Sequence, residues 1–258
     1  MILIYLMMSY KAMKINDLYR VEAYDASSLL CCAFCRGTDV WRDIELSVGN
    51  MVSGYPFDIE GVKFHNSESA YIAAAFSLGT PEHLAIQREL VDCSNGFLAK
   101  KGIRRPNTHL MRSDWEEFNV AWMQYVVWCK CLSNSDFARK LMSIPREAVI
   151  IENSTFQTGH TSTFWGTRND ELRRLTLALK RDLKAQGWNK AAIKREIDAR
   201  RLGEWSKVGV FRGNNVMGKI LMACREALLT GVPPAIDYDR LNAAGITLLG
   251  HSLTFAAA

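Results

Sequence analysis

The sequence predicts a single compact α+β domain that is mostly helical, with a few short strands and one basic helical insertion. Three observations lead to this fold class. Apolar and polar residues alternate over residues 57–64, as they do in a β-hairpin. From residue 67 to residue 141, apolar residues recur mainly at helical spacing. A short apolar run at residues 148–152 then predicts a buried strand late in the chain.

The bulk composition is that of an ordinary globular protein. The chain has 258 residues, of which 48% are hydrophobic and 23% charged, so it can bury a substantial core without disulfide bonds or structural metal ions. We expect one domain over residues 1–258. The net charge of +5 is mild and does not by itself indicate nucleic acid. Residues 1–8 are apolar but too few to span a bilayer, so we expect no membrane partner.

The seven cysteines follow no secretory signal, which predicts free thiols in a reducing cytoplasm. Cys32 and Cys35 form a CxxC pair, but a zinc site needs a second pair, and Cys129 and Cys131 have poor spacing for one. Buried apolar cysteines are the favoured interpretation. We expect neither a metal nor a cofactor.

The first third of the chain leads to a helix that carries Glu68. Residues 27–34 predict a strand, residues 43–48 a second strand or the start of a loop, and residues 57–64 a hairpin. Ser67 is expected to cap the next helix, because its hydroxyl can accept from unpaired backbone N–H groups. Glu68 then lies in the first turn, where it is either a capping charge or an acid/base group.

Further helices are expected up to residue 143. Thr80 and Pro81 predict the start of a helix over residues 82–91, and residues 94–101 predict a short helix closed by Gly102. Ser113 and Glu116 have the spacing of a capping box. The long helix after them has one apolar stripe, interpreted as core, and residues 136–143 form another helix; the stripe comprises Phe118, Ala121, Trp122, Tyr125, Val126, Cys129 and Leu132.

Two later segments bear on function. The apolar run at residues 148–152 places Glu152 at the end of a buried strand, and Trp165 follows after a polar loop. Gly213 and Gly218 bound a turn that opens a helix over residues 219–229, where backbone N–H groups can bind an anion.

Residues 168–201 contain eleven Lys and Arg residues against five acids, a net charge of +6, whereas the rest of the chain carries −1. Leucine and isoleucine spacing predicts a helical hairpin here. The hairpin is either a solvated helix pair or a surface that contacts phosphates. For the second interpretation, the expected nucleic-acid face comprises Arg173, Arg174, Lys180 and Arg181.

Glu68 and Glu152 come from elements that can face one cleft, and Trp115 and Trp165 can line it. Hydrolysis of an N-glycosidic bond needs such groups, because a carboxylate can stabilise the oxocarbenium character at the ribose or activate water. Aromatic walls can stack the base. Asn215 can hydrogen-bond a sugar or phosphate.

A set of motifs in fixed order resembles the NADAR family, the YbiA-like N-glycosidases, over residues 46–228. The motifs are Tyr55-Pro56-Phe57 with Gly61 before Glu68, Arg112 and Trp115 with Met123, Ile150-Ile151-Glu152-Asn153, Phe164-Trp165-Gly166, and Gly213-Asn214-Asn215-Val216-Met217-Gly218. The resemblance implies a compact domain around one cleft. It makes Glu68 and Glu152 the expected catalytic residues, with substrate-binding roles expected for Arg112, Trp115, Trp165, Gly166, Gly213, Asn214 and Asn215.

The resemblance implies an N-glycosidase that removes ADP-ribose from guanine in nucleic acid and opposes an ADP-ribosyltransferase, with the basic insertion favouring a large phosphate-bearing substrate. A second family branch cleaves ribosylated pyrimidine intermediates of riboflavin biosynthesis. A third alternative is a non-catalytic module that binds ADP-ribose or modified DNA. It is favoured by Ile72 and Ala75, which stand where the family often has Gln and Lys; Ser69 and Thr167 are further departures, at positions where the family often has His and an acid. Retention of both glutamates and both tryptophans favours the enzyme.

Overall fold

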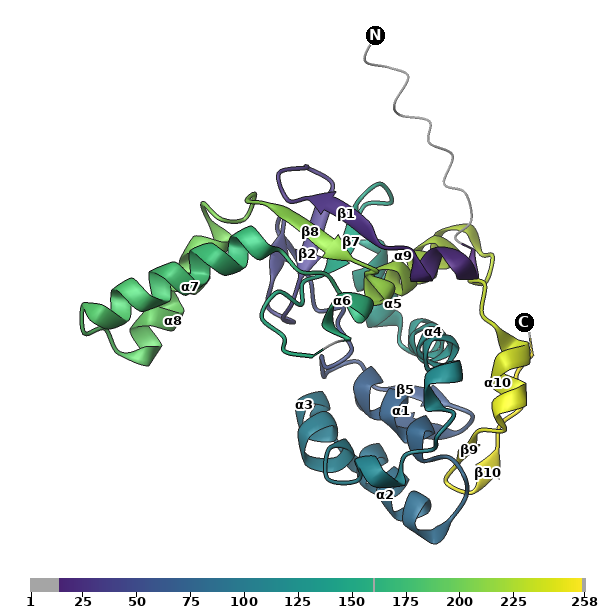
Figure 1. The fold of residues 1–258 in the computed structure, drawn as a ribbon. Helices are drawn as coiled ribbons and strands as arrows, with labels where there is room; N and C mark the ends of the chain where they lie inside the picture. The colour runs from purple at the N-terminus through teal and green to yellow at the C-terminus, as the bar shows by residue number, and fades with distance from the viewer. Residues whose placement is uncertain (1–13, 160, 257–258) are drawn as a thin grey trace.

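The computed structural model describes residues 14–159 and 161–256 of the chain, and the apolar segment 1–8 lies outside these residues. The fold is mostly helical with several short strands, which confirms the predicted α+β class (Figure 1). The strands are β1 Glu22–Asp25, β2 Cys31–Phe34, β3 Val40–Trp41, β4 Ile44–Glu45, β5 Phe57–Ile59, β6 Val62–Phe64, β7 Val149–Glu152, β8 Val210–Gly213, β9 Thr247–Leu248 and β10 His251–Ser252.

The α-helices are α1 Ser67–Ala73, α2 Pro81–Asp92, α3 Gly96–Leu98, α4 Trp115–Ser133, α5 Ser135–Met142, α6 Ser162–Trp165, α7 Asp170–Ala185, α8 Lys190–Leu202, α9 Val216–Thr230 and α10 Tyr238–Ala244. Short 3₁₀ turns cover Ile15–Tyr19, Ala74–Phe76 and Thr108–Leu110, and a π-helical turn covers Ala99–Arg104. No helix in the described part of the chain is long and apolar enough to cross a bilayer.

The strands pair mostly two by two. β2 runs parallel to β7, so the strand predicted over residues 27–34 is confirmed over its last four residues. β1 pairs antiparallel with β8, and β3 with β4. β5 and β6 form the predicted hairpin, whose turn has positive φ angles at Glu60 (49°) and Gly61 (83°). Such a turn matches the twist of the strands, and Asp58 Oδ1 accepts from the backbone N–H of Gly61.

Helix α4 is the centre of the core. Trp122 is fully buried there, and its Nε1 donates to the backbone oxygen of Ala70, which ties α4 to α1. The predicted stripe is largely buried, but Leu132 is 64% exposed, although its neighbours Lys130 and Cys131 in the same last turn are buried. The capping box predicted from Ser113 and Glu116 does not form. The N-cap position belongs to Asp114, whose carboxylate pairs with Arg112 instead.

The boundaries of the other helices agree with the predictions only in part. Thr80 caps α2, as predicted, by accepting from the backbone N–H of His83. Gly102 closes no helix, because it lies inside the π-helical turn after α3. α9 begins at Val216, three residues before the predicted start, and follows Asn215 in a left-handed conformation.

The predicted basic hairpin is helical and consists of α7 and α8. In Figure 1 the two helices run alongside each other and project from the rest of the molecule. Asn169 caps α7 and Asn189 caps α8 through their side-chain oxygens. The hairpin returns to the body at β8, which follows α8 and pairs with β1.

Candidate active site

Glu68 is placed by the start of α1. The N-cap is Asn66 rather than the predicted Ser67, since Asn66 is extended and its Oδ1 accepts from the backbone N–H of Ser69 at 2.8 Å. Its amide nitrogen also donates to the oxygen of Cys93, so one side chain caps α1 and ties it to the end of α2. Glu68 itself is buried, and its backbone N–H donates to the oxygen of Asn50.

Glu152 is placed by the end of β7, as the sequence predicts. Its backbone N–H donates to Oδ1 of Asn215 at 3.0 Å, and its backbone oxygen accepts from the N–H and the hydroxyl of Thr167. These bonds fix the main chain on both sides, while the half-buried side chain points into a cavity that Glu68 also lines.

That cavity has a volume of about 390 Å³, and we call it the glutamate pocket. Its wall also includes Trp165 and parts of the loop after β2, residues 49–52, the π-helical turn and α4. The structure therefore brings together three of the four residues predicted to line one cleft, namely both glutamates and Trp165.

The fourth, Trp115, lies outside the wall of the glutamate pocket. Its ring is buried behind Tyr71, with ring centroids 4.8 Å apart, and packs edge-on against Phe118. Tyr71 lines the pocket and also meets the ring of Trp165 at 5.4 Å. Trp115 thus supports the aromatic wall from the core side and does not face the cavity.

Glu68 and Glu152 have different electrostatic surroundings in the glutamate pocket, which affects the pKa of each carboxyl group. Burial raises the pKa of Glu68, and the nearby charges of Lys100 and Arg104 oppose that rise. The Nζ atom of Lys100 lies 3.9 Å from Oε1 of Glu68. Burial and the charge of Glu68 raise the pKa of Glu152 to about 7, with Lys100 again opposing. Two carboxyl groups that differ in this way can divide acid and base roles near neutral pH.

Several pocket residues were not foreseen from the sequence. Lys100 and Arg104 lie four positions apart in the π-helical turn and bring two cations to the carboxylates. The cluster of basic residues at 100–105 is the only local signal for them. Glu116 and Asn119 of α4 also line the pocket, where the amide of Asn119 donates to Glu116 at 2.8 Å.

Asn215 and Arg112 are structural residues in this fold, away from the lining of the pocket. Asn215 is fully buried, and its amide joins Ile150 and Glu152 of β7 through their main chain. Arg112 is 7% exposed and donates to Asp114, to the hydroxyl of Ser77 and to the oxygen of Ala244. Neither side chain lines the pocket in which a substrate-binding role was predicted for it.

The glycines and Asn214 also support the site from outside. A Cβ on Gly166 would lie 2.7 Å from the backbone oxygen of Glu152, so only glycine permits this approach to β7. Gly213 ends β8, and Asn214 donates from its amide to the oxygen of Tyr19. The backbone N–H groups of Asn214 and Asn215 bond to the oxygens of Thr163 and Gly166, so these two groups of the turn are already paired within the protein.

A second cavity, of about 750 Å³, lies between α7, α8 and the body, and we call it the helical groove. It shares Cys35, Arg36 and Gln157 with the glutamate pocket. Six cations and one acid line it, together with exposed apolar groups such as Trp188 and Phe156; the charged residues are Arg36, Lys180, Lys184, Lys190, Lys194, Arg201 and Asp198.

The predicted nucleic-acid face is only partly in this groove. Lys180 lines it, whereas Arg174 and Arg181 lie with Lys180 and Lys184 on an adjoining strip of α7. Arg173 lines neither surface. Arg173 is half-buried in the first turn of α7, whereas Lys180, two turns later, is exposed.

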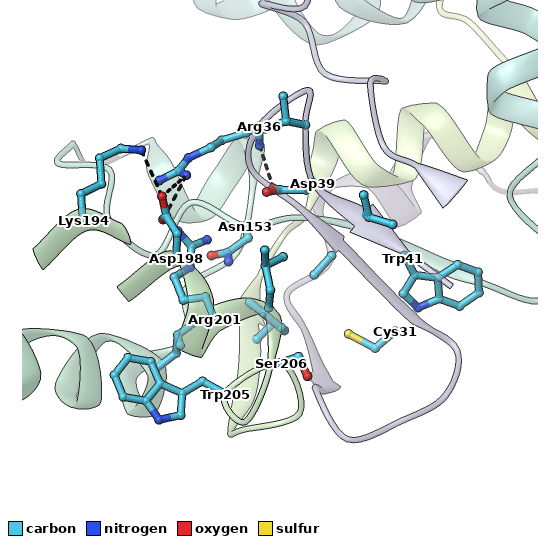
Figure 2. Close-up of a pocket in the computed structure, with 16 residues that line it drawn as sticks. Cys31, Arg36, Asp39, Trp41, Asn153, Lys194, Asp198, Arg201, Trp205 and Ser206 are labelled. Atoms are coloured by element: carbon cyan, nitrogen blue, oxygen red, sulfur yellow. Dashed lines mark hydrogen bonds and ion pairs between the residues drawn. The ribbon is translucent and has the colours of Figure 1, made fainter. Parts of the chain in front are cut away.

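A third cavity, of about 390 Å³, adjoins the helical groove on the side of β3 (Figure 2). Figure 2 shows Arg36 and Lys194 both bonded to Asp198, with Asn153 and Arg201 close by. All seven cysteines are free thiols. Within residues 14–159 and 161–256, no three His, Cys, Asp or Glu side chains gather as metal ligands would.

Comparisons with known proteins assign no family to the chain. No protein-family model matches it, and no curated protein is a recognisable relative in sequence. The similarity to the NADAR family, and the roles it implies for Glu68 and Glu152, therefore stay predictions.

Proposed function

We propose that this protein is a hydrolase that cleaves the N-glycosidic bond between a ribose and a base. The observation that carries the proposal is the pairing of Glu152, with a pKa of about 7, and Glu68, which is beside Lys100, in one pocket with an aromatic wall. An acid that is half protonated near neutral pH beside a second carboxylate suits this reaction.

In the proposed reaction, protonated Glu152 donates its proton to the departing base as the bond from C1 of the ribose to nitrogen breaks. The Glu68 carboxylate faces the positive charge that develops at C1. A water molecule then adds its oxygen to C1, and its proton passes to one of the carboxylates, so that free sugar and free base leave. Trp165 and Tyr71 are positioned to flank the base and exclude bulk water.

The cation beside Glu68 also bears on the alternative of a binding module without activity. That alternative was favoured by the absence of a lysine at Ala75, but Ala75 is fully buried in the core and cannot face the pocket. Lys100 supplies a cation next to Glu68 from a different element. The enzyme is therefore our first proposal.

For the substrate, we propose ADP-ribose linked to guanine in nucleic acid. The support is that the glutamate pocket adjoins the helical groove and shares three lining residues with it, because a large anionic substrate could then contact both. A small ribosylated pyrimidine, as in riboflavin biosynthesis, would occupy the pocket alone and leave the groove without a role. An ADP-ribosyltransferase is the enzyme that would make the favoured substrate.

The test offers the purified protein an oligonucleotide carrying ADP-ribosylated guanine and, separately, a phosphoribosylamino-pyrimidine. We expect free ADP-ribose and restored guanine from the first, measured by mass spectrometry, and slow or no release from the second. Glu68→Gln should slow this release. Glu117→Gln is its matched control, because this exposed glutamate of α4 lies outside the pocket lining and its loss should leave turnover intact. Faster release from the pyrimidine would reverse the assignment of substrate, and binding of ADP-ribose with no release from either would favour the module.

A further inference from the structure

The junction of the three cavities is occupied by one side chain. Arg36 lines the glutamate pocket, the helical groove and the third cavity. It is not part of the acid/base pair described above. Its position makes it the first cation that a ligand would meet on passing from the glutamate pocket into the groove.

The main chain at Arg36 is fixed, whereas its side chain is accessible. One carboxylate oxygen of Asp39 accepts from the backbone N–H of Cys35 at 2.6 Å and of Arg36 at 2.8 Å. The side chain is 44% exposed, and one guanidinium nitrogen donates to both oxygens of Asp198, each at 3.0 Å. An arginine with this anchoring can change its partner without moving the loop that carries it.

Asp198 does not depend on Arg36 for its charge partner. Lys194, one turn earlier on α8, places its Nζ 3.0 Å from Oδ2 of Asp198. If Arg36 turned away, Asp198 would keep a cation. An exposed ion pair of this kind is weak, so the exchange of one anion for another at Arg36 is cheap in free energy.

We propose that Arg36 determines specificity for phosphorylated ribosides, by leaving Asp198 and binding a phosphate of the substrate at the mouth of the glutamate pocket. The planar guanidinium suits a phosphate, to which it can donate two parallel hydrogen bonds. The remaining anionic part of the ligand then faces Lys180, Lys184 and Lys190 along the groove. The inference rests on the proposed function in one respect, since it takes a riboside to occupy the glutamate pocket.

The test is calorimetric titration of the full chain with ADP-ribose, which measures binding without hydrolysis. Arg36→Gln should bind about tenfold to a hundredfold more weakly than the wild type, the usual loss for a charge-assisted contact. Asp198→Asn should bind more tightly, because Arg36 is released. Arg195→Gln removes an exposed charge of α8 outside the groove lining, and should stay within about twofold of the wild type.

A double variant separates the exchange of partners from a general effect of charge. In Arg36→Gln/Asp198→Asn, the gain from Asp198→Asn should largely disappear, because that gain acts through Arg36. A full gain in the double variant, or weakening by both single variants, would overturn the proposal, as would wild-type affinity in Arg36→Gln or no binding of ADP-ribose to the wild type. Thermal unfolding of each variant checks that it is folded.

The failure of this inference and the failure of the proposed function can be told apart. If ADP-ribose binds with the expected pattern but no base is released from any ribosylated substrate, the hydrolase proposal fails and the role of Arg36 stands. If base is released and Arg36→Gln leaves binding unchanged, only the role of Arg36 fails.

Discussion

The glutamate pocket and the helical groove share three residues and yet differ in their balance of charge, because Arg36, Lys100 and Arg104 offset the carboxyl groups of the pocket, whereas one acid faces six cations in the groove. The pocket contains three carboxyl groups, two of them close enough to perturb each other, in a wall drawn from α1, α4 and β7. The groove contains six cations and lies along a hairpin that projects from the body. Burial in the pocket changes protonation, whereas exposure in the groove leaves the cations charged and screened by salt.

This difference suggests that the two regions contribute to different steps. A perturbed carboxyl pair in a pocket affects the rate of a bond-breaking step, and exposed cations affect the affinity and its salt dependence. Changes in the pocket should then appear in turnover at any salt concentration, and changes in the groove should appear in binding at low salt.

The largest effect is expected for Glu68→Gln. The amide keeps the size of the side chain but cannot hold the negative charge that faces the developing cation, so the single-turnover rate should fall at least about a hundredfold. If Glu68 only stabilises the start of α1, the variant should lose about 1 kcal/mol or less of stability and keep its turnover. Unchanged turnover would transfer the proposed role to Glu152.

The pH dependence of Glu152 should give the next effect. With a pKa of about 7, Glu152 loses its proton as the pH rises through neutrality, so the rate should fall by about tenfold per pH unit above 7. Glu152→Gln should be slow at every pH and lack this limb. A wild-type rate that stays level up to pH 9 would contradict the role of Glu152 as the acid.

The same shift predicts a change in stability. Because the pKa of Glu152 is raised in the folded state, its contribution is fully present below about pH 4.5 and is lost as the pH rises to about 7. The free energy of unfolding should fall by up to roughly 3 kcal/mol across this window. Glu152→Gln should flatten that part of the curve, as measured by urea unfolding at several pH values.

In the groove, Lys180→Gln/Lys184→Gln should weaken binding of the modified oligonucleotide at low salt. It should also lower the slope of log affinity against log salt by nearly one unit per lost phosphate contact. Release of sugar from a free small substrate should be nearly unchanged. Arg195→Gln/Lys207→Gln removes the same charge from exposed sites outside the groove lining. An equal loss of slope in that control would mean that the groove is not the site at which the phosphates bind.

The sequence was informative wherever the signal is local. The Glu60-Gly61 turn, the Thr80 cap and the apolar run before Glu152 each depend on neighbours within a few positions, and the structure has all three elements. The helical hairpin was also predictable, because its leucine spacing and charge excess both lie within residues 168–201.

What could not be predicted depends on contacts between distant elements. Lys100 meets Glu68 only because the π-helical turn packs beside α1. Asn215 looks like a ligand-binding amide in sequence, but it is fully satisfied by β7, more than sixty positions earlier. No local rule distinguishes an amide that faces a cavity from one that joins two buried main chains.

The smallest expected effect concerns Trp115 and Trp165, for which the sequence predicts the same role in lining the cleft. Trp115 packs behind Tyr71 and Trp165 lines the pocket. Trp115→Phe should therefore lower stability by about 1 kcal/mol through lost packing, and should change the Michaelis constant by less than about twofold. Trp165→Phe should raise that constant several-fold, since a smaller ring stacks less well on the base. Equal effects of the two substitutions on substrate binding would mean that the aromatic wall acts as one unit, with Tyr71 transmitting the change from the core to the cavity.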